Sequence, residues 1–81
     1  MKLQNFNLFP VSFTSPNTAD TEFTVTHTCE LDGKPVIPRG LIVARRFKAA
    51  QLYYDPAEWT ETSAKMHADT GTATFNVLFV V

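Results

Sequence analysis

The clearest pattern in the sequence is a strict alternation of apolar and polar residues in the segment 21–29. Phe23, Val25, His27 and Cys29 take every second position, and polar residues, mainly threonines, fill the positions between them. Because successive side chains of a β-strand point to opposite faces, this spacing predicts a strand with one buried and one solvated face. Ala- and Leu-rich runs at helical spacing are missing, so we expect a chain that is nearly all β.

Further segments have the character of strands. The run 3–9 alternates asparagines with apolar residues, and we expect Pro10 to close this strand or to place it at an edge. Four consecutive apolar residues in 41–44 favour a strand buried on both faces. We also expect strands at 51–54, 63–69 and 75–81, with a loop over 12–20.

Turn residues separate these segments. The pairs Asp32-Gly33 and Asp55-Pro56 predict turns, and the segment 69–72 predicts the turn of a closing hairpin. The sequence therefore predicts an all-β fold, a small antiparallel β-sandwich or barrel of six or seven short strands. We expect a single domain over residues 1–81, in which residues 1–19 form an N-terminal strand or arm.

The last strand has apolar residues on both faces. Phe75, Val77, Phe79 and Val81 share one face, whereas Leu78 and Val80 lie on the other. In so small a domain, one of these faces is expected to meet another subunit. The charged fraction of 19 %, below the roughly 25 % typical of soluble proteins, also indicates that subunits cover part of the surface.

The charge balance and the single cysteine limit other possibilities. Lys and Arg number 7 against 8 Asp and Glu, giving a net charge of −1, which disfavours generic nucleic-acid binding. No intramolecular disulfide can form with Cys29 alone. The N-terminus has no signal-peptide core, and no apolar run approaches the ~20 residues that cross a bilayer. We therefore expect a soluble chain, made in the cytoplasm and not associated with a membrane.

Few residues suggest chemistry. His27 and Cys29 could place two ligands on one metal, with His67 as a third, but a core or interface role explains them better. Asp55, Glu58 and Glu61 surround Trp59 as paired acids do in glycosidases, although solvated turn residues are the simpler interpretation. We predict no catalytic, cofactor or metal site.

The segment Arg45-Arg46-Phe47-Lys48 supports a rival hypothesis. With Tyr53, Tyr54 and Trp59 nearby, it could hold single-stranded nucleic acid by charge and stacking. The alternative is an edge strand whose arginines lie at a subunit boundary. Trp59 is expected to be a core or interface anchor, and a carbohydrate-stacking role for it is the other possibility.

The order of several motifs is similar to a known group of proteins. The motifs are residues 23–27 (F-x-V-x-H), Pro38-Arg39-Gly40 with its following apolar strand, Tyr53-Tyr54-Asp55, Trp59-Thr60 and Phe75-Asn76-Val77. Their order resembles that of small tailed-bacteriophage structural proteins and of terminal β domains of phage tail or fibre proteins. The resemblance covers about residues 20–81. The group commonly has Leu-Gly after the histidine, where this chain has Thr28-Cys29.

The resemblance implies a non-enzymatic virion part, made in the host cytoplasm, that forms homo-oligomers, often trimers, and binds a larger phage virion protein. Capsid decoration, connector and tail or fibre component all remain open as its position. The alternatives are a single-stranded nucleic-acid-binding barrel and a carbohydrate-binding receptor-recognition tip. The residues expected at the interface are Phe75, Leu78, Phe79, Val80, Arg45, Arg46 and Trp59.

Overall fold

The computed structural model describes residues 2–3 and 6–81 of the chain. Strands are the main elements, and the described residues include one 3-10 helix, η1, and no α-helix. The elements are β1 (Lys2–Leu3), β2 (Phe6–Thr14), β3 (Phe23–Thr26), β4 (Glu30–Leu31), β5 (Lys34–Pro35), β6 (Gly40–Arg46), β7 (Leu52–Tyr54), η1 (Pro56–Glu58), β8 (Ser63–Ala68) and β9 (Thr74–Val80).

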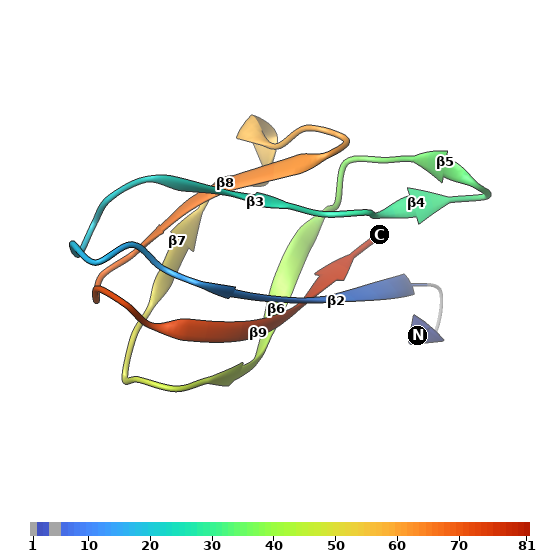
Figure 1. The fold of residues 1–81 in the computed structure, drawn as a ribbon. Helices are drawn as coiled ribbons and strands as arrows, with labels where there is room; N and C mark the ends of the chain where they lie inside the picture. Colours follow the sequence, from blue (N-terminus) through green and yellow to red (C-terminus); the bar gives the residue numbers. More distant parts are fainter. Residues whose placement is uncertain (1, 4–5) are drawn as a thin grey trace.

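Two antiparallel sheets face each other as the layers of a sandwich (Figure 1). One sheet has four strands in the order β1-β2-β9-β6, and the other has three in the order β3-β8-β7. Strands β4 and β5 form a separate hairpin. The all-β prediction is confirmed, and since the sheets do not close on each other, the sandwich is the correct alternative and the barrel is not.

Strand β9 lies at the centre of the four-stranded sheet, between β2 and β6. The predicted alternation along it is confirmed: Phe75, Val77 and Phe79 are buried, whereas Leu78 and Val80 on the opposite face are half-buried. The expected closing hairpin is wrong, because β8 pairs in the three-stranded sheet and β9 in the other. The turn after β8 therefore carries the chain from one layer to the other.

Strand β8 occupies the centre of the three-stranded sheet and supplies the opposite wall of the core. Ala64, Met66 and Ala68 face inward and are buried, as their alternation predicted. Lys65 and His67 lie between them in sequence and therefore point to the outer face. The small alanines leave room between the sheets for larger side chains from other elements.

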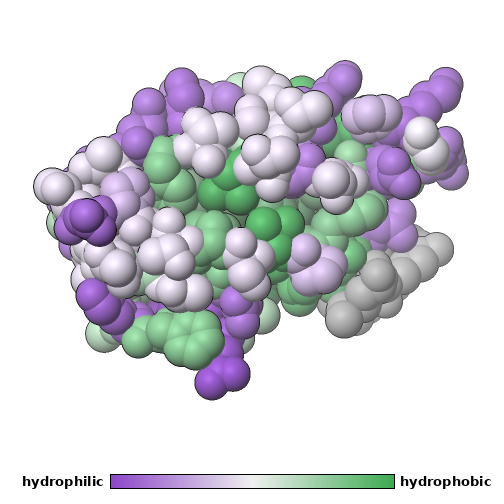
Figure 2. Space-filling view, viewed as in Figure 1, coloured by the Kyte–Doolittle hydropathy of each residue, from purple (hydrophilic) through white to green (hydrophobic). Residues whose placement is uncertain are grey.

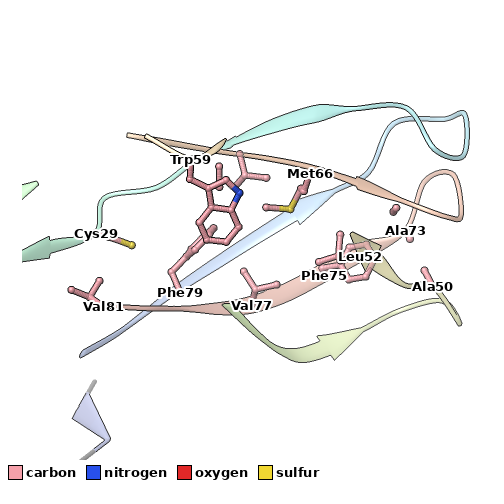
Figure 3. Close-up of a cluster of buried hydrophobic side chains, with 13 residues drawn as sticks. Cys29, Ala50, Leu52, Trp59, Met66, Ala73, Phe75, Val77, Phe79 and Val81 are labelled. Atoms are coloured by element: carbon pink, nitrogen blue, oxygen red, sulfur yellow. The ribbon is translucent and has the colours of Figure 1, made fainter. Parts of the chain in front are cut away.

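The largest of these side chains belongs to Trp59, which Figure 3 shows reaching across the interior toward Phe79. The two rings meet edge to face, with centroids 5.5 Å apart and planes at 78°. The indole Nε1–H donates to the carbonyl oxygen of Lys65 at 3.0 Å, so the one polar atom of the ring has a partner. Trp59 thus joins η1, β8 and β9 into one core.

Strand β2 is longer than the sequence suggested and continues through Pro10 to Thr14. Asn7 and Val81 exchange both backbone hydrogen bonds, at 3.2 and 2.9 Å, so alternate residues of β2 from Asn7 onward point their N–H groups at β9. Pro10 falls between these positions, where the missing donor faces away from β9. Pro10 therefore marks an edge, and the predicted loop over 12–20 begins only after Thr14.

Strand β6 departs most from expectation. The run 41–44 was predicted to be buried on both faces, yet Ile42 and Val43 are 46 % and 36 % exposed. The reason is position: β6 is the last strand of its sheet, and the register shifts between Val43 and Arg45. An apolar run thus forms an exposed edge strand with a bulge.

Two turns explain local sequence choices. Asp32 and Gly33 both have positive φ, 54° and 78°, which is the twist that a two-residue hairpin between β4 and β5 requires. At Gly71, a Cβ atom would overlap the carbonyl oxygen of Asn17, so only glycine fits where the loop after β2 meets the turn after β8.

Candidate assembly surface

The outer face of the four-stranded sheet carries apolar side chains at one end. Strand register places Pro10, Leu78 and Ile42 in one row across β2, β9 and β6, with Leu8, Val80 and Gly40 in the adjacent row. Leu8 is buried, Leu78 and Val80 are half-buried, and Pro10 and Ile42 are exposed. We call Pro10, Ile42, Leu78 and Val80 the apolar outer face.

A polar row borders this face. Register places Ser12, Asn76 and Arg45 side by side, and the Ser12 hydroxyl donates to Asn76 Oδ1 at 2.7 Å. The outer surface therefore changes from apolar to polar between one outward-facing row of residues and the next. An apolar centre with a polar border is the usual composition of a protein–protein interface.

The edge of β6 extends the apolar surface around the side of the sandwich. Val43 points toward the inner side but is 36 % exposed, because the three-stranded sheet does not cover it. No strand among the described residues pairs with the outer edge of β6. Tyr54 contacts this strand through its hydroxyl, which donates to the Leu41 carbonyl oxygen at 3.3 Å.

The basic segment after the bulge folds against its own chain. The Arg45 guanidinium lies over the exposed Phe47 ring at 4.7 Å from its centroid, and Arg46 Nη1 donates to the Ala50 carbonyl oxygen at 3.0 Å. Lys48 Nζ donates to the Gly71 carbonyl oxygen, also at 3.0 Å. Trp59 lies in the core, so its ring is not part of an exposed surface beside these basic side chains.

The predicted interface residues divide into two groups. Leu78, Val80, Arg45 and Arg46 lie at the surface of the four-stranded sheet. In contrast, Phe75 and Phe79 are 0 % exposed and Trp59 is 4 % exposed, within the core of the same chain. Phe75 and Phe79 were expected at an interface, and Trp59 either there or in the core. All three lie inside the domain, where a partner has no access to them. The alternation along 75–81 already separated Phe75 and Phe79 from Leu78 and Val80.

His27 is a structural core residue. Its Nδ1 accepts the backbone N–H of Cys29 at 3.2 Å, and its Nε2 lies 2.9 Å from the Thr60 carbonyl oxygen. Because Nδ1 is an acceptor, the hydrogen-bond network assigns the proton to Nε2, which donates to Thr60. The ring is buried and lies 5.4 Å from that of Phe79. Both ring nitrogens are therefore used in holding the end of β3 to the loop before β8.

The other candidate metal ligands do not join it. Cys29 is buried, and burial raises the pKa of its thiol to about 11, which keeps the sulfur protonated and unreactive at neutral pH. His67 lies on the outer face of the three-stranded sheet. Among the residues that the structure describes, no group of three or more His, Cys, Asp or Glu side chains is placed to hold a metal ion.

Of the three carboxylates near Trp59 in sequence, two lie in one groove and the third lies elsewhere. Asp55 Oδ1 accepts the Ala57 N–H at 3.0 Å and begins η1, which ends at Glu58. Asp55 and Glu58 line one groove, whereas Glu61 lies beside the hollow at His27 and Cys29. Trp59 is buried, so Asp55 and Glu58 do not flank an exposed tryptophan ring.

Two residues that the sequence did not single out together lie in that groove. Tyr53 and His67 stack across β7 and β8, with centroids 5.1 Å apart and planes at 16°. Tyr53 is 47 % exposed, and the lining also includes Glu22, Tyr54, Lys65 and Met66. The alternation along β8 predicts that His67 points outward. Tyr53 lies beside it because β7 pairs with β8, and no local sequence pattern predicts that pairing.

In comparisons with known proteins, no protein-family model, curated protein sequence or solved structure matches the chain. No helix among the described residues is long and apolar enough to cross a membrane.

Proposed function

We propose that the chain is a non-enzymatic structural subunit of a bacteriophage virion, where it associates with copies of itself and binds a larger virion protein. Its position would be that of a capsid decoration, connector or tail/fibre component. The observation that carries the proposal is the apolar outer face, whose residues stay exposed or half-buried although the core beneath them is complete. The virion context rests on the motif order of residues 23–27, 38–40, 53–55, 59–60 and 75–77.

The core does not need the outer face for its own packing. Phe75, Val77 and Phe79 fill the interior from β9, and none of them is more than 1 % exposed. Covering Ile42, Leu78 and Val80 by a partner stabilises the complex by about 25 cal/mol per Å2 of apolar area removed from water. Figure 2, viewed as in Figure 1, shows hydrophobic residues gathered between the layers, with hydrophilic residues along the upper surface over β8.

A trimer is the form of self-association that we propose. In a threefold ring, the apolar outer face of one copy packs against a different surface of the next copy, because ring contacts are heterologous. The exposed edge of β6 is continuous with this face and extends the contact area. Arg45, beside Asn76 and Ser12, then lies at the polar border of the contact, where arginine is common.

Sedimentation velocity of the purified chain tests the self-association. We expect a trimer at micromolar concentration, and a monomer for Leu78→Lys, because a buried ammonium without a partner is costly. Thr24→Lys is the matched control, since Thr24 is exposed on the outer face of the other sheet. It should remain trimeric.

A wild-type chain that stays monomeric, or a Leu78→Lys chain that stays trimeric, would contradict this proposal. Circular dichroism spectra of both variants should match the wild type, which separates lost association from lost folding. For the virion context, mass spectrometry of phage particles purified by density is expected to recover the chain. Its absence from intact particles, with expression in the infected cell, would contradict a structural role.

A further inference from the structure

We infer that the outer face of the three-stranded sheet carries a saccharide-binding groove centred on Tyr53. The groove has a volume of about 350 Å3, within the range of small-molecule sites. Its lining includes Glu22, Tyr53, Asp55, Glu58, Lys65 and His67, and we call it the Tyr53 groove. It lies on the opposite side of the molecule from the apolar outer face and does not depend on the proposed assembly.

Strand pairing explains why these side chains converge. Tyr53 on β7 is paired with His67 on β8, and Thr24 on β3 is paired with Lys65. Because side chains two residues apart share a face, Lys65 and His67 both point outward. Glu22 approaches from beside β3, and its carboxylate lies 4.0 Å from Lys65 Nζ. The pleat of the sheet thus sets an imidazole, an ammonium and a carboxylate beside one phenol ring.

The Tyr53 ring provides a shelf for the flat face of a sugar. It is 47 % exposed, and stacking on His67 at 5.1 Å holds it in one orientation. The C–H groups on one face of a pyranose pack against an aromatic ring, while the phenol hydroxyl stays available at its edge. A shelf that is fixed before binding lowers the ordering cost of the complex.

The polar groups around the shelf are free to bind hydroxyl groups. The Tyr53 hydroxyl, the His67 ring nitrogens and the Glu58 carboxylate form no hydrogen bond or ion pair with the described part of the chain. Carboxylates accept hydrogen bonds from pairs of hydroxyls, and an ammonium donates to them. Asp55 begins η1 by accepting the Ala57 N–H, which fixes the wall that carries Glu58.

The charge of the groove argues against other classes of ligand. Three carboxylates, from Glu22, Asp55 and Glu58, face one ammonium, from Lys65, so phosphates and nucleic acids are repelled. A metal ion is disfavoured because the described residues contain no suitable group of three ligands. Four charged side chains beside Tyr54 and Met66 do not suit a ligand that is apolar throughout. An uncharged polyhydroxyl compound meets both the ring and the hydrogen-bonding groups.

Two-dimensional 1H–15N NMR titration of the full chain tests the inference, with maltotriose, chitotriose and galactobiose as probes. We expect at least one probe to shift the amide signals of Tyr53, His67 and Glu58 with a millimolar or tighter Kd. Tyr53→Ala should weaken that binding at least about tenfold. Glu58→Gln should weaken it by a smaller factor, because the amide keeps one acceptor oxygen.

Phe47→Ala is the matched control, since Phe47 is also an exposed aromatic but lies outside the groove. It should bind the sugar as the wild type does, and the dispersed spectra of all three variants should report an intact fold. Absence of shifts with every probe overturns the inference, as does unchanged affinity in Tyr53→Ala. A tetra-arginine peptide that binds the groove when the sugars do not also overturns it, and would assign the groove to a cationic partner.

Discussion

The two sheets of this domain share one core, but their outer surfaces differ in polarity. The four-stranded sheet shows Pro10, Ile42, Leu78 and Val80, whereas the three-stranded sheet shows polar side chains around one tyrosine. Each sheet has buried apolar residues at the alternate positions that face the core. Folding alone therefore does not require the outer surfaces to differ. The two proposals assign the surfaces different roles, contact with a protein partner on one side and binding of a small ligand on the other.

The largest expected effect comes from neighbouring residues of β9. Phe79→Ala removes a fully buried ring and is expected to lower the free energy of unfolding by about 3–5 kcal/mol, a large part of the stability of a small domain. Val80→Ala, one residue away on the outer face, should cost less than about 1 kcal/mol in the monomer. Urea denaturation measures both, and equal losses would break the distinction between inner and outer residues.

The effect of high pH on Cys29 tests whether the interior between the two sheets excludes water. Its folded-state pKa of about 11 lies above the ordinary value of 9.0, because burial disfavours the thiolate. Above pH 9 the unfolded chain loses this proton while the folded chain keeps it, so stability is complete below pH 9 and falls as the pH rises toward 11. The loss amounts to at most about 2–3 kcal/mol.

The measurement is the free energy of unfolding of wild type and Cys29→Ala between pH 8 and pH 11. Tyrosine and lysine titration is common to both proteins, so the difference between the two curves isolates the thiol. We expect this difference to shrink as the pH rises. A constant difference would mean that water reaches the sulfur, and that the sheets are less tightly packed than described.

A smaller effect is expected at the junction between the sheets. Asp69 Oδ1 accepts the Gln51 N–H at 2.9 Å, and this hydrogen bond, with the Thr70 hydroxyl and the charge of Arg46, lowers the pKa of Asp69 below its ordinary 3.8. The depressed pKa stabilises the fold above pH 4, and the contribution is lost as the pH falls through the folded-state value. Asp69→Asn keeps the acceptor and should flatten the acid limb of the stability curve.

Carbon-detected NMR titration of the Asp69 carboxyl gives its pKa directly. An ordinary value in the folded chain would remove the basis for this acid limb.

The smallest effect is expected on the polar face itself. Glu22 and Lys65 are 4.0 Å apart with both side chains exposed, and such pairs contribute about 0–1 kcal/mol. A double-mutant cycle of Glu22→Ala and Lys65→Ala should therefore give a coupling energy of less than about 0.5 kcal/mol. A larger coupling would mean that the polar face stabilises the fold, and is not simply kept free for a ligand.

Much of the fold was predictable because it depends on local alternation. The inward residues of β8 and β9, the outward threonines of segment 21–29 and the turn at Asp32-Gly33 all follow from neighbours in sequence. The exposure of Ile42 and Val43 was not predictable, because the same apolar run suits a central strand and an edge strand. Which strand lies last in a sheet depends on pairings between distant segments.

The candidate sites show the same limit. Leu78 and Val80 were predicted to lie on the second face of the last strand, because side chains of a strand alternate between its two faces. Trp59 was placed between core and interface, and only the packing on Phe79 decides that it lies in the core. The Tyr53 groove requires β7 to lie beside β8, and no motif in the sequence encodes that contact.

Hydroxyl-radical footprinting of the assembled protein tests the difference between the two faces most directly. Mass spectrometry then reads the labelling of individual side chains. We predict that Ile42 and Leu78 are protected in the assembly and become labelled when dilution separates the subunits. In Leu78→Lys, where residue 78 is itself changed, Ile42 should become labelled. Tyr53 and His67 should be labelled equally in both states. Protection of Tyr53 and His67, with free labelling of Ile42 and Leu78, would contradict the account.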